Sequence, residues 1–194
     1  MTPTESTRNK ILSVTADEIY QHGFVATSLS VILKRCEISK GALYHHFENK
    51  LELGYAVFEE IFAPKFLSTW QPALHADDPI EALCELLTSF YQGKTCAEVS
   101  CGCPLNKLCQ EMALIDEGFR TRIYTMQDQL HNTFIEAFER ISNELRDDID
   151  YSQVTYFILA SMHGASDLSK SSLNVDLFEK VMIELCRYIR TLRK

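Results

Sequence analysis

The chain has 194 residues, 46% of them hydrophobic and 24% charged, which is the balance of a globular protein with a core of its own. Its apolar runs are far shorter than the roughly 20 residues that span a bilayer, and the first ten residues lack a signal peptide's apolar stretch, so we expect a cytoplasmic protein without a membrane partner. The formal net charge of −8 argues against a nucleic-acid-binding surface over the whole molecule. Residues 1–55, however, carry six basic and six acidic residues, so the excess of negative charge lies in residues 56–194.

The first predicted elements are three helices separated by short connections. Apolar spacing predicts a helix over residues 5–22, and Gly23 follows where a left-handed terminating residue is favoured. Thr27 is the predicted cap of a short second helix, and Ser39 the predicted cap of a third over residues 40–47. The second and third helices are too short to be stable alone, so they must pack on the first.

The remaining elements are also predicted to be helical. A fourth helix begins near Lys50 and continues towards Trp70, and Pro64 is expected to kink or end it. Five further helices are predicted over residues 79–93, 104–113, 116–145, 152–171 and 174–192. The fold class is therefore all-α, with about nine helices.

Residues 27–47 have the pattern of a helix-turn-helix, in which the second helix reads DNA. The outward residues of that helix include Gly41 and Ala42, which are small enough to let a base edge or phosphate approach, and the hydrogen-bonding side chains of Tyr44 and His45. We do not expect His45 and His46 to form a metal-chelating pair, because adjacent helical residues point about 100° apart.

The stretch "TSLSVILKRCEISKGALYHHFENKLEL" resembles the DNA-binding signature of the tetracycline-repressor (TetR) family of bacterial transcription regulators. The resemblance implies an N-terminal helix-turn-helix domain over residues 1–50 and an effector-binding and dimerisation domain over residues 51–194. It implies a homodimer through the last two helices, a palindromic double-stranded operator, a small-molecule effector, no cofactor and no enzymatic activity. One departure is the turn between the helices, which usually contains Gly and here has Cys36-Glu37.

By position in the motif, the resemblance also implies which residues contact DNA. The start of the second helix supplies phosphate contacts, the start of the third faces bases and backbone, and later residues anchor the backbone. These DNA-binding residues are Thr27, Ser28, Ser39, Lys40, Gly41, Ala42, Tyr44, His45 and Lys50.

The effector pocket is expected among the helices between about residues 53 and 163. The candidate lining residues are aromatic, with two His that offer polar contacts, although core packing is the more ordinary role for each. They are Phe62, Phe66, Trp70, Phe90, Tyr91, His131, Phe134, Tyr156 and His163.

The segment "CAEVSCGCPLNKLCQEM" crowds four of the seven Cys into residues 96–109. Cys103 directly precedes Pro104, so we expect its thiol at a helix N-terminus, where the helix dipole lowers the thiol pKa. "GCPLNK" resembles a Gly-Cys segment in a subgroup of the family whose members include electrophile- and oxidant-responsive repressors. That resemblance implies Cys103 as sensor, with Lys107 and Lys170 as its activators; a purely structural Cys103 is the alternative.

The predicted function is thus a DNA-binding transcriptional regulator, in the first place a repressor. It is released from its operator by a small-molecule ligand or by modification of a reactive cysteine. Three alternatives remain: an enzyme with Cys103 as nucleophile, which lacks a Cys-His signature, a metal-responsive regulator that uses the 96–109 cysteine cluster, and a helical interaction module that does not bind DNA. No metal is predicted, because the four Cys are separated by four, one and five residues, and only the first of these spacings lies in the range of two to four residues that is typical between paired ligands of structural zinc.

Overall fold

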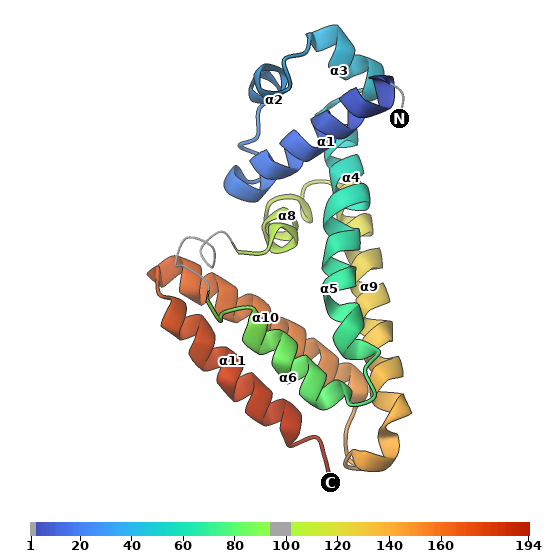
Figure 1. Cartoon of the computed structure of the whole chain (residues 1–194), viewed down its shortest axis with the longest axis vertical. Helices are drawn as coiled ribbons and strands as arrows, with labels where there is room; N and C mark the ends of the chain where they lie inside the picture. Colours follow the sequence, from blue (N-terminus) through green and yellow to red (C-terminus); the bar gives the residue numbers. More distant parts are fainter. Residues whose placement is uncertain (1–2, 94–101) are drawn as a thin grey trace. The chain divides into compact units, whose positions relative to one another are not determined.

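The computed structural model describes residues 3–93 and 102–194, and every regular element in these ranges is a helix (Figure 1). The all-α prediction is confirmed. None of the described helices has the length and apolar character needed to cross a membrane. Taking the continuous run α4–η1–α5 as one helix gives nine in the described residues, besides the short 3-10 helix η2 (Ser142–Glu144): α1 (Pro3–His22), α2 (Leu29–Cys36), α3 (Lys40–His46), α4 (Lys50–Val57) with the π-helical turn η1 (Phe58–Phe62) and α5 (Ala63–Leu74), α6 (Pro79–Ser89), α8 (Pro104–Met112), α9 (Glu117–Arg140), α10 (Tyr151–Ser172) and α11 (Val175–Arg190).

The chain divides into two compact units. The first comprises Met1–Phe66 and Cys103–Thr125, and the second comprises Leu67–Gly102 and Met126–Lys194. The first unit therefore contains α1 to α4 and also α8 with the beginning of α9. The second unit contains α6, α10 and α11 with the remainder of α5 and α9.

The core of the first unit lies between α1 and the short helices that follow it. The predicted inner face of α1 is buried, and α2, α3 and α4 each add an apolar side chain to it. The buried residues are Ile11, Leu12, Thr15, Ala16 and Ile19 of α1 with Ile32, Leu43, Phe47, Leu53 and Val57. Burying these side chains stabilises two helices that could not stand alone.

The cap of α2 differs from the prediction. Ser28 is the N-cap, and its hydroxyl accepts a hydrogen bond from the Val31 N–H at 3.3 Å. Thr27 is buried, and its hydroxyl donates to the Gly23 carbonyl at 2.7 Å. The prediction of a Thr27 cap is wrong because this β-branched side chain turns back to close the preceding turn, which leaves the next hydroxyl to cap the helix.

The turn of the helix-turn-helix is closed by a residue that is not glycine. Glu37 ends α2 in the left-handed conformation, with φ 56° and ψ 42°, and its N–H bonds the Leu33 and Lys34 carbonyls. The turn therefore has the geometry that Gly usually supplies, in spite of the Cys36-Glu37 departure. An L-residue pays about 1–2 kcal/mol for this conformation.

Glu37→Gly is expected to raise the free energy of unfolding by about 1 kcal/mol, because Gly removes the left-handed strain at a smaller cost in chain entropy. Removal of the Glu37 carboxylate should lower the free energy of unfolding very little, because its 4.0 Å ion pair with Lys10 is solvent-exposed. The control is Glu37→Ala, which removes the same charge and keeps the strain, and both are compared by urea unfolding at one protein concentration. A gain for Ala equal to that for Gly would contradict the strain argument.

The helix that starts at Lys50 runs through Pro64 without ending, so the expectation of a stop there is wrong, while the expected kink stays a prediction. The residues before the proline widen into the π-turn η1, in which the Ala63 N–H reaches the Phe58 carbonyl, five residues back. Proline lacks the N–H that an α-helix needs, and a widened turn before it accommodates the missing bond. The helix continues as α5 to Leu74.

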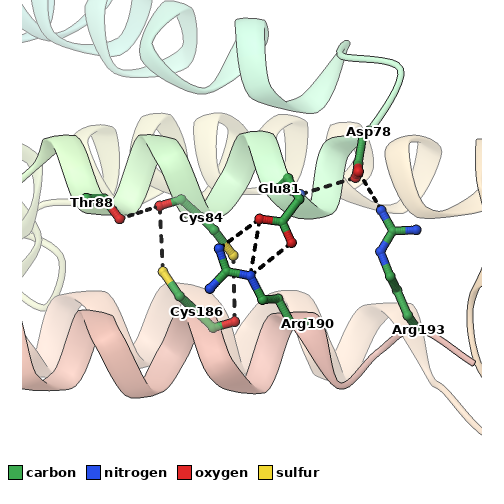
Figure 2. A network of polar contacts seen from close by, with 7 residues as sticks. All are labelled: Asp78, Glu81, Cys84, Thr88, Cys186, Arg190 and Arg193. Carbon is green, nitrogen blue, oxygen red and sulfur yellow. Dashed lines mark hydrogen bonds and ion pairs between the residues drawn. The ribbon is translucent and has the colours of Figure 1, made fainter.

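In the second unit, α11 packs beside α6 on one side and beside α10 on another (Figure 1). A polar network ties α6 to α11 (Figure 2). The Arg190 guanidinium bonds both oxygens of Glu81, with Nε–Oε1 2.9 Å and Nη2–Oε2 2.7 Å. The thiols of Cys84 and Cys186 each donate to the other's backbone carbonyl at 3.6 Å. Burial, and after it the neighbouring Cys186, raises the pKa of the Cys84 thiol to about 12, so the Cys84 thiol is protonated at neutral pH.

Candidate nucleic-acid interface

The outer face of α3 is a ridge of solvent-exposed polar side chains. Ser39 caps the helix by accepting from the Ala42 N–H at 3.2 Å. Lys40 Nζ lies 5.6 Å from the centre of the Tyr44 ring, whose residue is 41% exposed. Gly41 faces open space, because a Cβ built on it would meet only Ser39 Oγ at 3.9 Å. The predicted recognition residues therefore form one exposed surface with a bare backbone at its centre.

The two His of α3 have different environments. Their rings meet edge to face at 5.2 Å, and His45 is exposed while His46 is half-buried. The pKa of His46 is lowered by burial, and further by the charges of His45 and Arg8. His46 is thus neutral at neutral pH and acts in packing, whereas His45 remains on the outer surface.

Ion pairs join α1 to α2 and to η1. Arg35 on α2 donates to Glu18 at 2.7 Å, and Arg8 donates to both oxygens of Glu60 at 2.6 and 2.7 Å. The Arg8 guanidinium also lies 5.2 Å from the centre of the Phe47 ring. Bidentate Arg pairs have a defined geometry, so they fix orientation more than an ordinary surface pair does.

The other predicted DNA-contacting residues are in mixed positions. Ser28 is half-buried, and its hydroxyl also lies 2.7 Å from that of Ser30. Thr27 is only 2% exposed, so its hydroxyl is not on the outer surface. Lys50 donates to the Val25 carbonyl at 3.2 Å and lies 4.6 Å from the centre of the Phe24 ring, which gives it a structural contact at the start of α4.

Cys103 stands at the head of α8, as the sequence predicts, but its predicted pKa shift has the wrong direction. It is the N-cap residue and is followed by Pro104. Burial raises the pKa of the Cys103 thiol, and this outweighs the lowering by the N–H groups of Asn106 and Leu105. The expectation of a lowered pKa is wrong because the cost of removing a thiolate from water exceeds the gain from the helix N-terminus.

The predicted partners of Cys103 are engaged elsewhere or lie in the other unit. Lys107 donates to the Tyr20 carbonyl at 2.6 Å, and its ammonium lies 5.8 Å from the centre of the Tyr20 ring. The Lys107 ammonium therefore binds a backbone carbonyl at the end of α1. Lys170 is exposed on α10 in the second unit, and its role as an activator stays a prediction.

The cysteine cluster gives no metal site within the residues described. Cys96 and Cys101 lie outside these residues, and the remaining pair, Cys103 and Cys109, is half-buried. No group of three or more metal-binding side chains is present in residues 3–93 and 102–194. The metal-responsive alternative is not favoured, and neither is the enzyme, because the raised pKa of Cys103 disfavours a nucleophilic thiolate.

The candidate pocket residues separate into groups. Trp70 lies at the centre of an aromatic cluster, 5.3 Å from the Phe134 ring and 6.0 Å from that of Phe90. His131 stacks on Tyr156 at 4.6 Å, and its Nε2 lies 2.9 Å from the Ser152 hydroxyl. Tyr156 is 61% exposed, so this stack is at the surface of the second unit.

The other four candidates are divided between the two units. His163 in α10 is half-buried, and burial lowers its pKa, against a smaller opposing effect of Asp167. Tyr91 follows α6 and is half-buried. Phe62 and Phe66 belong to the first unit.

Two acidic residues without a distinctive sequence motif join α8 and α9 to the N-terminal helices. Asp116 accepts from the Tyr55 hydroxyl and the Phe119 N–H, both at 2.8 Å, while Glu111 accepts from the backbone near Phe24. Nothing in their spacing distinguishes them from solvent-facing charges. Asp116 begins the predicted helix over residues 116–145, and this position at a helix start is the one signal the sequence offers.

Residues 11–57 match the sequence model of the family described as bacterial regulatory proteins of the tetR family. An uncharacterized HTH-type transcriptional regulator in the lacX 3' region of Lactococcus lactis subsp. lactis is 25% identical over 181 residues, 90% of this chain and 88% of that relative. The HTH-type transcriptional repressor NemR of Escherichia coli K12 is 37% identical over 57 residues, which is 29% of each chain.

Solved structures show the same fold over the full length. The transcriptional regulator of the TetR family from Cytophaga hutchinsonii has a TM-score of 0.86 at 21% identity, covering 100% of this chain and 98% of that one. The reduced form of E. coli NemR has a TM-score of 0.80 at 21% identity, with 97% of each chain covered. Residues 11–57 therefore match the tetR family of bacterial regulatory proteins, and the chain as a whole shares the fold of solved TetR regulators.

Proposed function

We propose that the chain is a dimeric repressor that binds a palindromic operator through α3 and releases it when a small molecule binds. Residues 1–50 contact DNA, and residues 51–194 bind the effector and dimerise. The observation that carries this proposal is the exposed ridge of Lys40 and Tyr44 beside the bare backbone of Gly41. The repressor role is supported by the name of NemR, and a protein with this role acts in the cytoplasm.

The dimer is proposed to form through α10 and α11. Their inner faces are used in the second unit, yet α10 still exposes apolar side chains, with Phe157 49% and Leu168 54% exposed. Gly164 lies between them, and a Cβ there would meet nothing within 4 Å, so a partner helix can approach closely. A twofold pair then presents two copies of α3 to half-sites roughly 34–36 Å apart, which is one turn of DNA.

The effector is proposed to be a small, largely apolar molecule bound in the second unit. The aromatic cluster of Trp70, Phe90 and Phe134 supports this, since such side chains line most small-molecule sites. Release is a two-state population shift, for which a differential affinity of about 1–3 kcal/mol between the two states suffices.

Selection of duplexes from a random pool by the full-length wild-type protein tests the proposed function. The selected sequences should be palindromic, and their affinity should fall steeply with salt concentration, because phosphate contacts release counterions. Selection of no common sequence, or an affinity that salt leaves unchanged, would contradict the proposal.

Cys103 is proposed as a second trigger, because it stands at the head of α8, whose later turns contact the end of α1. Since burial raises its pKa, the thiol is protonated at neutral pH, and the reactive thiolate accumulates only as the pH rises towards that pKa. We therefore expect alkylation of Cys103 by iodoacetamide to be slow at pH 7 and to accelerate continuously above pH 8. Mass spectrometry of the peptide that contains Cys103 measures the rate.

Cys103→Ser is the matched variant for this trigger. It should bind the operator as the wild type does and should no longer release it after alkylation at high pH. Release that persists in Cys103→Ser, or a wild-type alkylation rate that is already at its maximum at pH 7, would argue against this trigger.

A further inference from the structure

The segment that joins α1 to α2 is held by a side chain from α8. Both the Phe24 and Val25 N–H groups donate to the same oxygen of Glu111, Oε2, at 2.6 and 3.1 Å. Glu111 lies 86 and 87 residues away in the sequence, within the same compact unit. A carboxylate that accepts two backbone hydrogen bonds forms stronger bonds than a neutral acceptor, so this contact fixes the backbone of the turn.

A second contact from the same face of α8 holds the last turn of α1. Lys107, four residues before Glu111, donates to the Tyr20 carbonyl at 2.6 Å. Carbonyls in the last turn of a helix carry its negative end, and a cation there is stabilising. The Lys107 ammonium thus contacts a carbonyl at the end of α1, and the Glu111 carboxylate contacts the Phe24 and Val25 N–H groups that follow α1.

The turn itself is shaped to receive this carboxylate. Gly23 has φ +85°, and a Cβ built on it would lie 2.0 Å from Glu111 Oε1, so any other residue would displace the contact. Lys50, at the start of α4, bonds the Val25 carbonyl from its own side chain at 3.2 Å. The turn between α1 and α2 is therefore held by α8 through its N–H groups and by α4 through a carbonyl.

We propose that Glu111 is a positioning residue for operator binding: by holding the Phe24–Val25 backbone, with Lys107 on the end of α1, it sets where α2 and α3 lie relative to α8. The inference rests on the proposed function for its operator readout. Cys103, Lys107 and Glu111 follow one another at intervals of four residues, so they share one face of α8. A displacement of α8 is transmitted to the helix-turn-helix through this contact.

Three variants of the full-length protein test the inference. Glu111→Ala removes the acceptor. Glu111→Gln retains an oxygen that can replace Oε2 for both amides and loses only the charge. Glu139→Ala, at an exposed position of α9 in the second unit, changes the net charge as Glu111→Ala does. Two quantities are measured for each: hydrogen exchange of the Phe24 and Val25 amides, and affinity for the duplex that the wild type selects from a random pool.

Glu111→Ala is expected to speed exchange of both amides by about tenfold or more and to weaken operator binding by a similar factor, since two charge-assisted hydrogen bonds are lost. Exchange of the Ile11 and Ile19 amides in α1 should not change, which shows that the domain remains folded. In Glu111→Gln, the exchange rates of the two amides and the operator affinity should both lie close to the wild-type values. Glu139→Ala should match the wild type in both measurements.

Two results would overturn the inference. One is unchanged exchange at Phe24 and Val25 in Glu111→Ala. The other is faster exchange with an operator affinity equal to that of Glu139→Ala. A wild-type protein that selects no duplex would instead overturn the proposed function, and the exchange measurement would still decide whether Glu111 holds the turn.

Discussion

Tyr44→Ala should lower operator affinity by about 100-fold or more, because each contact to DNA is worth about 1–3 kcal/mol and a dimer loses two of them. The Tyr44 ring stands on the outer face of α3 with Lys40 above it, so its removal also frees the Lys40 side chain. The free energy of unfolding should change by less than about 0.5 kcal/mol, since the side chain is 41% exposed and does not belong to the core.

The control for this substitution is Tyr124→Ala, which removes a 67% exposed Tyr from α9 in the same compact unit. It should leave operator affinity within about twofold of the wild type, as is usual for a surface substitution away from the interface. Fluorescence anisotropy with the selected duplex measures both variants. Equal operator affinities for the two variants would show that the outer face of α3 does not contact the operator.

Gly54→Ala is expected to destabilise the protein by about 2–3 kcal/mol, although the same change in most helices is stabilising. Gly54 is buried in α4, and a Cβ there would lie 2.4 Å from the Phe24 ring and 2.8 Å from the Phe119 ring. These two rings pack edge to face at 5.0 Å, so neither can move without breaking the contact between them.

Gly41→Ala is the matched control, because it places the same methyl group on a helical glycine where nearly all the space is open. Its free energy of unfolding should rise by about 0.5–1 kcal/mol, the usual difference between the two residues in a helix. Its operator affinity should fall, since the methyl group covers the bare backbone of α3. A Gly54→Ala protein as stable as the wild type would show that α4 does not pack tightly on Phe24 and Phe119.

The helices could be predicted because their signals are local. Apolar spacing identifies the buried face of α1, and a cap residue such as Ser39 identifies where a helix begins. The capping error at Thr27 is also local: two adjacent hydroxyl residues could each cap α2, and the sequence does not show which one turns back to Gly23.

The remaining features depend on contacts between distant residues, and local patterns do not encode these. The left-handed Glu37 is tolerated because α2 and α3 are both anchored on α1, which overcomes a strain that would normally exclude Glu. The contact from Glu111 to Phe24 spans 87 residues and has no periodicity. Cys103 depends on both local and distant features. Its position at the N-terminus of α8 could be predicted from the neighbouring Pro104. Its burial depends on packing, and this burial reverses the expected direction of the pKa shift.

Hydroxyl-radical footprinting of the selected duplex by the wild-type protein tests the central claim most directly. If two chains each place α3 in a major groove, two protected segments should be centred about 10 base pairs apart on one face of the duplex and related by a twofold axis. A single protected segment, or protection spread evenly along the duplex, would contradict a symmetric pair of recognition helices.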